Sequence, residues 1–192
     1  MFIPSNVIFT DECSIMLEQH AKLCFRKRGD PGKLKPTVKH PYKVHVWGGI
    51  SKRGATYMVI FDGIMESTFY VHLLQQGLVD FIRNTFPDGC RFQQDNDPKH
   101  MSIIAHAYFT EADIPYWPTP AESPDLNPIE MLWHELKHHL RKRVKPTTKE
   151  TLVNGIKQFW TQLTPERCTK YIAHLQKVLP AVLEQQGQAS GY

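Results

Sequence analysis

Three acidic residues in this sequence stand where carboxylates can gather around a divalent cation. Asp11 follows a short apolar run, Asp95 follows a pair of glutamines, and Glu130 comes later, with residues 96 to 129, thirty-four in all, between it and Asp95. Hard oxygen ligands without supporting Cys or His suit Mg²⁺ or Mn²⁺ better than zinc. Two such ions about 3.5–4 Å apart can activate the attacking oxygen and stabilise the leaving oxygen of a phosphoryl transfer. The three acids therefore predict a metal-dependent phosphodiester site.

Each acid also has a simpler explanation. Asp11 can be a strand-end acid that faces water, and Asp95 can belong to an ordinary turn with the Asn, Asp and Pro that follow it. For Glu130, an Asn127 N-cap and Pro128 at the first helical position give the spacing of a capping box. Capping and metal binding do not exclude each other, so from the residues alone both uses stay open.

A second motif suggests different metal chemistry. The stretch His134-Glu135-Leu136-Lys137-His138 matches HExxH, the helix on which two histidines bind zinc and a glutamate activates water. The extended form of that motif fails here, because Arg141 stands where glycine is needed and Val144 where the third histidine is needed. A zinc metallopeptidase therefore remains a remote alternative.

Basic residues are concentrated in two stretches, although the net charge is only +4. The first covers residues 26–43 and the second residues 137–149. Clustered cations favour a polyanion, because neutralising phosphates releases condensed counterions. A solvated basic face is the alternative. The candidate nucleic-acid contacts are Arg26, Lys27, Arg28, Arg141, Lys142 and Arg143, with Lys99 and His100 beside Asp95.

Length and composition are those of one globular domain. The chain has 192 residues, 41% of them hydrophobic and 22% charged. No apolar run is long enough for a membrane span, and no secretory signal is recognisable. The four cysteines show no metal-ligand spacing, and we expect reduced thiols.

The pattern of apolar residues predicts an α/β domain with a mixed sheet. Apolar runs and turn residues indicate strands over 6–10, 44–50, 57–61, 91–94 and 114–117, the second and third as a hairpin. One helix is expected over 70–82 and a short one over 103–109. Residues 26–42 should form a long basic loop, and from about residue 128 to 186 the chain should be helical. This arrangement places Asp11 and Asp95 at the ends of strands and Glu130 at the start of a helix.

Several phrases resemble the catalytic domain of Tc/mariner-superfamily transposases, and the match is best to the Tc-type branch. They are Phe9-Thr10-Asp11-Glu12, Val46-Trp47-Gly48-Gly49-Ile50-Ser51, Gln94-Asp95-Asn96-Asp97-Pro98-Lys99-His100 and Ser123-Pro124-Asp125-Leu126-Asn127-Pro128-Ile129-Glu130. The resemblance implies a ribonuclease-H-like fold with a mixed five-stranded sheet. It also implies that Asp11, Asp95 and Glu130 form a DDE triad that holds two Mg²⁺ (or Mn²⁺) ions.

The same resemblance carries expectations about activity and partners. It implies cleavage of DNA at element ends and transfer of the freed strand into target DNA, in the nucleus. The basic stretch 26–43 would be an insertion that contacts DNA or a partner subunit, either a second copy or a full-length transposase.

The chain departs from the family pattern at its beginning. Family members carry paired helix-turn-helix modules before the first strand, and here only residues 1–6 precede it. We therefore expect a single catalytic domain over 1–192 without its sequence-specific DNA reader. Met101 and Ala121 also differ from the residues expected there. A catalytically silent relic, or a co-opted module that binds nucleic acid or a partner, is the alternative from another functional class.

Overall fold

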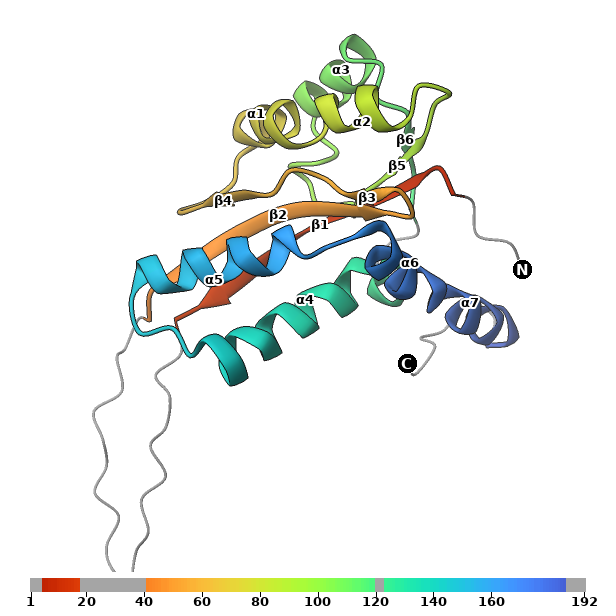
Figure 1. Ribbon diagram of the computed structural model, residues 1–192. Helices are drawn as coiled ribbons and strands as arrows, with labels where there is room; N and C mark the ends of the chain where they lie inside the picture. Colours follow the sequence, from red (N-terminus) through yellow and green to blue (C-terminus); the bar gives the residue numbers. More distant parts are fainter. Residues whose placement is uncertain (1–4, 18–40, 120–122, 186–192) are drawn as a thin grey trace, which may run out of the picture.

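The strands form a single mixed sheet in which the first strand is central (Figure 1). The computed structural model describes residues 5–17, 41–119 and 123–185. The sheet order is β3-β2-β1-β5-β6, and β4 also pairs with β2. β1 runs antiparallel to β2 and parallel to β5, which is in turn parallel to β6. The strands are β1 (Val7–Met16), β2 (Lys43–Ser51), β3 (Gly54–Ala55), β4 (Val59–Phe61), β5 (Arg91–Gln93) and β6 (Tyr116–Trp117).

β1 is twice as long as the apolar run that predicted it. It continues to Met16 because β2 pairs with it as far as Lys43, and because Cys13 and Ile15 keep the inward alternation of a half-buried strand. β5, in contrast, pairs with β1 only as far as Phe9, opposite Gln93. Asp11 therefore lies in the middle of its strand, not at the end, but beside the place where β5 has already stopped.

The returning arm of the hairpin is split into β3 and β4, so the sheet has six strands where five were expected. Ile50 pairs with Ala55, whereas Trp47 pairs with Val59, and this register leaves one extra residue on the returning arm. Thr56 lies in this bulge, where its hydroxyl accepts a hydrogen bond from the backbone N–H of Gly49 at 2.8 Å. Local hydrogen bonding of a Thr side chain thus replaces part of the expected ladder.

Three helices cover one face of the sheet (Figure 1). They are α1 (Ser67–Gly77), α2 (Val79–Thr85) and α3 (Ile103–Glu111). The single helix predicted over 70–82 is broken at Leu78, and its apolar face is buried in α1 but only partly buried at Phe81 and Ile82 in α2. The break follows Gly77, where a Cβ would come within 2.4 Å of the Trp47 ring. α1 therefore ends next to a glycine that lies close against the Trp47 ring.

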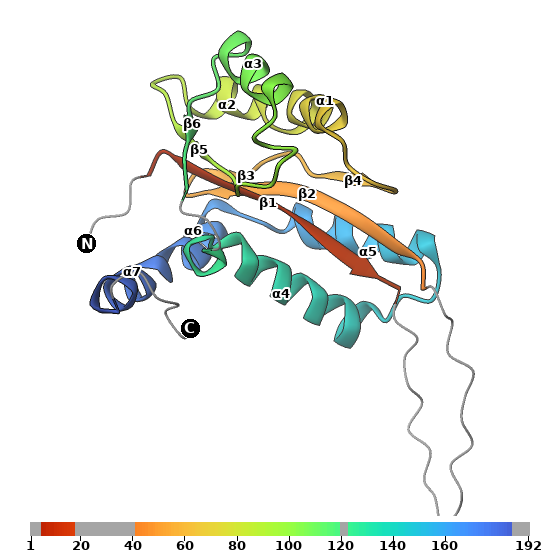
Figure 2. The same cartoon turned by 180° about the vertical axis from the view of Figure 1, so that it is seen from behind.

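The opposite face is covered by the C-terminal helices (Figure 2). They are α4 (Ile129–His139), α5 (Lys149–Thr161), α6 (Pro165–Ala173) and α7 (Leu175–Glu184), with a π-helical turn η2 (Leu140–Val144) after α4 and a 3₁₀ turn η1 (Pro124–Leu126) before it. α5 begins with a capping box between Thr148 and Thr151. α6 and α7 are divided at His174, and Pro180 lies inside α7.

The two faces have separate hydrophobic cores. Phe9, Cys13 and Ile15 of β1 pack with α4 to α7, whereas Ile8 packs with α1 to α3. Strand alternation therefore sends neighbouring residues of β1 into different cores. Three cysteines in the described ranges, Cys13, Cys90 and Cys168, are buried free thiols. No helix in this part of the chain is long and apolar enough to cross a membrane.

Candidate active site

The three predicted acids line one cavity of about 460 Å³. Asp11 comes from the middle of β1, Asp95 from the segment that leaves β5, and Glu130 from the first turn of α4. The cavity lies where β5 ends and exposes the flank of β1, with the η1 turn and the start of α4 on its other side. Gln93, Gln94, Asn96, Asp97, Thr119, Ser123, Pro124, Leu126 and Asn127 complete its lining.

Asp11 is held from the α4 side of the sheet. The indole N–H of Trp133 donates a hydrogen bond to Asp11 Oδ2 at 3.0 Å. Burial raises the pKa of Asp11 to about 8, and the nearby charges of Glu130, Glu12 and Asp95 add to that rise. Asp11 therefore reduces the charge repulsion within this acidic cluster by keeping a proton at neutral pH.

A stack of two tryptophans fixes the donor. The rings of Trp133 and Trp160 are stacked with centroids 5.7 Å apart, and Trp160 donates to the carbonyl of Thr56 in the β3–β4 bulge at 2.9 Å. Trp160 lies over Gly48, the residue paired with Asp11 in the neighbouring strand. The absence of a side chain at Gly48 is what lets the indole approach the sheet beside Asp11.

Asp95 is held from the other side of the sheet, through His100. His100 Nδ1 lies 2.5 Å from Asp95 Oδ1, and its Nε2 lies 2.7 Å from Glu12 Oε1. Burial opposes charging of this imidazole, yet its hydrogen bonds to Asp95 and Glu12 raise the pKa of His100 to about 9. The hydrogen bond from His100 in turn lowers the pKa of Asp95. The cavity therefore contains one carboxyl that resists ionisation and one that ionises easily.

Glu130 is free of the capping role that its spacing suggested. α4 begins with Pro128 as its N-cap and has no side-chain cap hydrogen bond, so the capping box that was the alternative explanation for Glu130 is not formed. Asn127 instead ties the start of the helix to β1, because its amide nitrogen donates to the carbonyl of Thr10 at 3.1 Å. Glu130 is exposed at the cavity, where the helix N-terminus favours its negative charge.

The donor set fits a hard divalent cation. It consists of three carboxylates without cysteine. Burial raises the pKa of Asp11, and the negative charges of Glu130, Glu12 and Asp95 raise it further, so a cation here would offset an excess of negative charge. In the described ranges no three His, Cys, Asp or Glu side chains are arranged to hold an ion as they stand. Asp11 and Asp95 are turned to Trp133 and His100 instead. A bound cation would replace the proton on Asp11 and draw the carboxylates together.

The HExxH stretch has a structural use. Glu135 accepts hydrogen bonds on both oxygens, from Arg167 at 2.6 Å and from the hydroxyl of Tyr171 at 2.5 Å. These contacts join α4 to α6. A glutamate so engaged is not available to activate a zinc-bound water, and the described residues contain no third ligand in place for zinc. The geometry gives no support to the metallopeptidase alternative.

The predicted nucleic-acid contacts are placed very differently from one another. Lys99 forms an ion pair with Asp97 at 2.6 Å, and His100 is 2% exposed, so its position does not support direct contact with DNA. Arg141, Lys142 and Arg143 are exposed on η2, at the far end of α4 from Glu130. Arg26, Lys27 and Arg28, and the loop 26–43 up to residue 40, lie outside the described residues.

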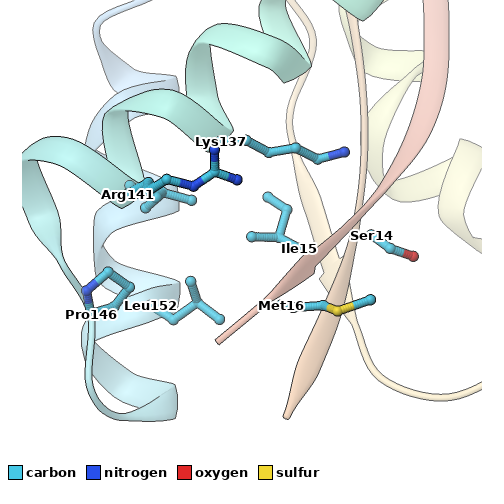
Figure 3. Close-up of a pocket in the computed structure, with 8 residues that line it drawn as sticks. Ser14, Ile15, Met16, Lys137, Arg141, Pro146 and Leu152 are labelled. Atoms are coloured by element: carbon cyan, nitrogen blue, oxygen red, sulfur yellow. The ribbon is translucent and has the colours of Figure 1, made fainter. Parts of the chain in front are cut away.

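A second cavity, of about 220 Å³, lies between the end of β1 and the last turns of α4 (Figure 3). Ile15, Leu140 and Leu152 contribute apolar side chains, and Lys137 and Arg141 add positive charge. In Figure 3 the Lys137 side chain extends from α4 toward β1. This cavity contains no carboxylate, so it is distinct from the acidic site.

Two supporting residues of the acidic site were not predicted from the sequence. Glu12 and Trp133 act through contacts that join residues 88 and 122 positions apart in the chain, which no local spacing reveals. Only the adjacency of Glu12 to Asp11 was visible, and strand alternation places the two on opposite faces.

Comparison with known proteins agrees with this arrangement. A family model described as DDE superfamily endonuclease matches residues 6–153. The Tcb2 transposase of Caenorhabditis briggsae is 35% identical over 143 residues, 71% of this chain and 52% of that protein. The Tc1 transposase of Caenorhabditis elegans is 30% identical over 158 residues, 82% of this chain and 58% of that protein. The chain thus spans about half the length of the curated relatives it matches.

Solved structures share the fold. The Mos1 mariner paired-end complex with Mn matches with a TM-score of 0.80 and 17% identity, over 96% of this chain and 56% of that one. The catalytic domain of Mos1 mariner transposase matches with a TM-score of 0.73 and 16% identity, over 95% and 83%. The Mos1 catalytic domain with raltegravir and Mg also matches, with a TM-score of 0.73 and 16% identity, over 96% of this chain and 85% of that one. The ribonuclease-H-like fold is the one predicted.

Proposed function

The chain belongs to the DDE superfamily endonucleases, in their Tc/mariner branch, and we propose that it is the catalytic core of a cut-and-paste DNA transposase. The observation that carries the proposal is the cavity in which Asp11, Asp95 and Glu130 meet. In this proposal the activity is metal-dependent DNA strand cleavage followed by strand transfer.

Asp11, Asp95 and Glu130 would hold two Mg²⁺ or Mn²⁺ ions. When bound, such ions activate the attacking hydroxyl or water and stabilise the leaving oxygen of the phosphodiester. The protein's own part is to present the carboxylates. Trp133 orients Asp11, and Asn127 holds the start of α4, and with it Glu130, against β1.

DNA is the proposed substrate, and the nucleus the proposed location, of this activity. The exposed cations of η2, Arg141, Lys142 and Arg143, would contact backbone phosphates away from the reacting one. We propose a second copy, or a full-length transposase, as the protein partner, since cutting both ends of an element calls for two catalytic sites. The relatives that match along half their length bear the name transposase for the whole protein.

The test is a plasmid-nicking assay with the purified chain. Supercoiled DNA should be nicked with Mg²⁺ or Mn²⁺ and left intact with EDTA, and Asp95→Ala should abolish nicking. Glu111→Ala, which removes an exposed acid at the end of α3, should nick like the unaltered chain. Equal nicking by Asp95→Ala would show that the activity comes from a contaminant and would refute the proposal.

The catalytically silent alternative makes a different prediction in the same assay. A relic or co-opted binding module would retard DNA in a gel yet leave it uncut with every divalent ion tried. That combination would replace the catalytic proposal with a binding one.

A further inference from the structure

We propose that Glu12 and His100 are positioning residues that fix the Asp95 carboxylate for metal binding, an inference that rests on the proposed function. Neither residue needs to touch the metal or the DNA. Their role would be to hold one oxygen of Asp95 so that the other meets the cation.

Two hydrogen bonds connect Glu12 of β1 to Asp95 through the side chain of His100. The imidazole of His100 lies between two carboxylates, with Nδ1 at 2.5 Å from Asp95 and Nε2 at 2.7 Å from Glu12. An ionised carboxylate can only accept, so a ring nitrogen that faces one holds it by donating. Charge-assisted hydrogen bonds of this kind are short and directional. The ring therefore cannot rotate without losing both of them.

The imidazole is also fixed by its surroundings. His100 is 2% exposed, and the ring of Tyr70 packs on it with centroids 4.2 Å apart. The hydroxyl of Tyr70 donates to the side-chain oxygen of Gln94, whose amide nitrogen donates to the carbonyl of His100 at 3.4 Å. The backbone N–H of His100 donates to the carbonyl of Asp97 at 2.9 Å. These contacts make His100 a rigid bridge.

Asp95 needs such a bridge because the sheet no longer supports it. β5 ends at Gln93, two residues before Asp95, and the Asp95 side chain is 55% exposed. Glu12, in contrast, lies in the middle of β1, directly after Asp11 and paired with Trp47 of β2. Through His100 and Glu12, the carboxylate of Asp95 is anchored to β1, the same strand that carries Asp11. The pair would thus set the separation of two metal-binding acids.

Both hydrogen bonds received by Asp95 in the described structure, from His100 and from the backbone N–H of Asp97, fall on Oδ1. A carboxylate has a second oxygen with which to bind a cation, and fixing the first orients it. Outer contacts that orient metal ligands typically change metal affinity or activity by about 10–100-fold when they are removed.

The test compares two substitutions of Glu12. Glu12→Ala removes both the charge and the hydrogen-bond acceptor, whereas Glu12→Gln removes the charge but keeps an acceptor for His100. Mn²⁺ binding to the purified chain is measured by titration calorimetry, with thermal unfolding in EDTA as the measure of folding. Glu12→Ala should weaken Mn²⁺ binding by about 10–100-fold, and Glu12→Gln should restore most of that loss. Glu111→Ala is the matched control and should bind like the unaltered chain.

Kinetics give a second readout. In the nicking assay Glu12→Ala should lower kcat with little change in KM for DNA, because the acid is displaced while the DNA-binding surface is intact. If Glu12→Ala does not fold at the assay temperature, His100→Gln takes its place. It can donate to only one of the two acids and should also weaken Mn²⁺ binding.

Distinct outcomes separate the two proposals. Equal losses in Glu12→Ala and Glu12→Gln would show that only the negative charge of Glu12 matters and would overturn the positioning role. Unchanged binding in Glu12→Ala, or in His100→Gln where it is used, would overturn it as well. If Asp95→Ala binds Mn²⁺ and nicks DNA like the unaltered chain, the proposed function itself fails.

Discussion

At the scale of single residues, carboxyl groups of the same chemistry are given different tasks by their partners. Burial and neighbouring acids raise the pKa of Asp11 to about 8, whereas the hydrogen bond from His100 lowers the pKa of Asp95. Glu135 receives two donors and joins helices. For Asp11 and Glu135 the sequence contains no sign of these differences, because their partners come from distant segments. His100 is only five residues from Asp95, but its burial depends on packing that the local sequence does not show.

Glu135 allows a test at this scale. Burial opposes its charge, but hydrogen bonds from Tyr171 and Arg167 lower its pKa below the ordinary value of 4.5. The folded state therefore holds this proton less tightly than the unfolded state. The resulting stabilisation is present above pH 4.5 and is lost as the pH falls through the lowered pKa. Glu135→Gln should lower the free energy of unfolding by under about 1 kcal/mol at neutral pH, since the pair is partly exposed.

The measurement is thermal unfolding across the acidic range. The difference between Glu135→Gln and the unaltered chain should shrink as the pH falls from about 6 to about 3. Glu111→Gln, an acid without these two donors, should show no such pH-dependent difference. A gap between Glu135→Gln and the unaltered chain that is constant with pH would contradict the assignment.

The site could be predicted from the sequence only in part. Asp11, Asp95 and Glu130 were identified from their surrounding phrases, and they line one cavity. Glu12, Trp133 and the buried position of His100 could not be, because each depends on packing between elements. Strand alternation even argued against Glu12, since it faces away from Asp11.

At the scale of elements, the contact between α5 and the sheet depends on Gly48. A Cβ at this position would lie 2.3 Å from the outer ring of Trp160. Gly48→Ala should therefore lower the free energy of unfolding by about 1–3 kcal/mol, as overpacking of a core does. It should also reduce nicking, because Trp160 supports Trp133 and through it Asp11.

A double-mutant cycle measures this clash. Trp160→Phe lacks the outer-ring atoms that approach Gly48, so Gly48→Ala should cost less in a Trp160→Phe background than in the unaltered chain. Chemical denaturation of the four proteins gives the coupling. Additive costs would show that the two residues do not oppose each other.

The apolar pattern predicted most elements, and the prediction failed where single contacts between elements decide the outcome. The strands at β2 and β5, the short helix α3 and the edge strand β6 were all expected. The break between α1 and α2 was not, because it follows the approach of Gly77 to Trp47. The split of β3 from β4 occurs where the Thr56 hydroxyl accepts a backbone hydrogen bond, and the pattern of apolar residues does not predict it.

At the scale of the whole molecule, the sheet separates two helical layers, and each layer braces a different acid. α4 supplies Trp133 to Asp11 and carries Glu130, while the layer of α1 to α3 encloses His100 through Tyr70. The acids of the candidate site therefore depend on both cores. A chain that lost either layer would lose the alignment of the cavity.

The exposed cations of η2 give the prediction for this scale. If Arg141, Lys142 and Arg143 each neutralise one phosphate, replacing all three with Ala should reduce the slope of log affinity against log salt by about 2.7. Binding to a labelled duplex at several salt concentrations measures the slope. The replacement should weaken random and repeat DNA alike, since phosphate contacts carry no sequence information. An unchanged slope would place the DNA elsewhere.

α4 begins at the acidic cavity and leads into the basic turn η2, so its length sets the distance between the two. Eleven positions separate Glu130 from Arg141, and at 1.5 Å per helical residue they span roughly 16 Å. A DNA strand advances about 3.4 Å per nucleotide, so this distance corresponds to about five nucleotides. A DNA duplex lying along α4 would contact the cations of η2 about half a turn of the DNA helix away from the phosphodiester bond at the acidic cavity. Very short oligonucleotides would then reach the acidic cavity or the cations of η2, but not both.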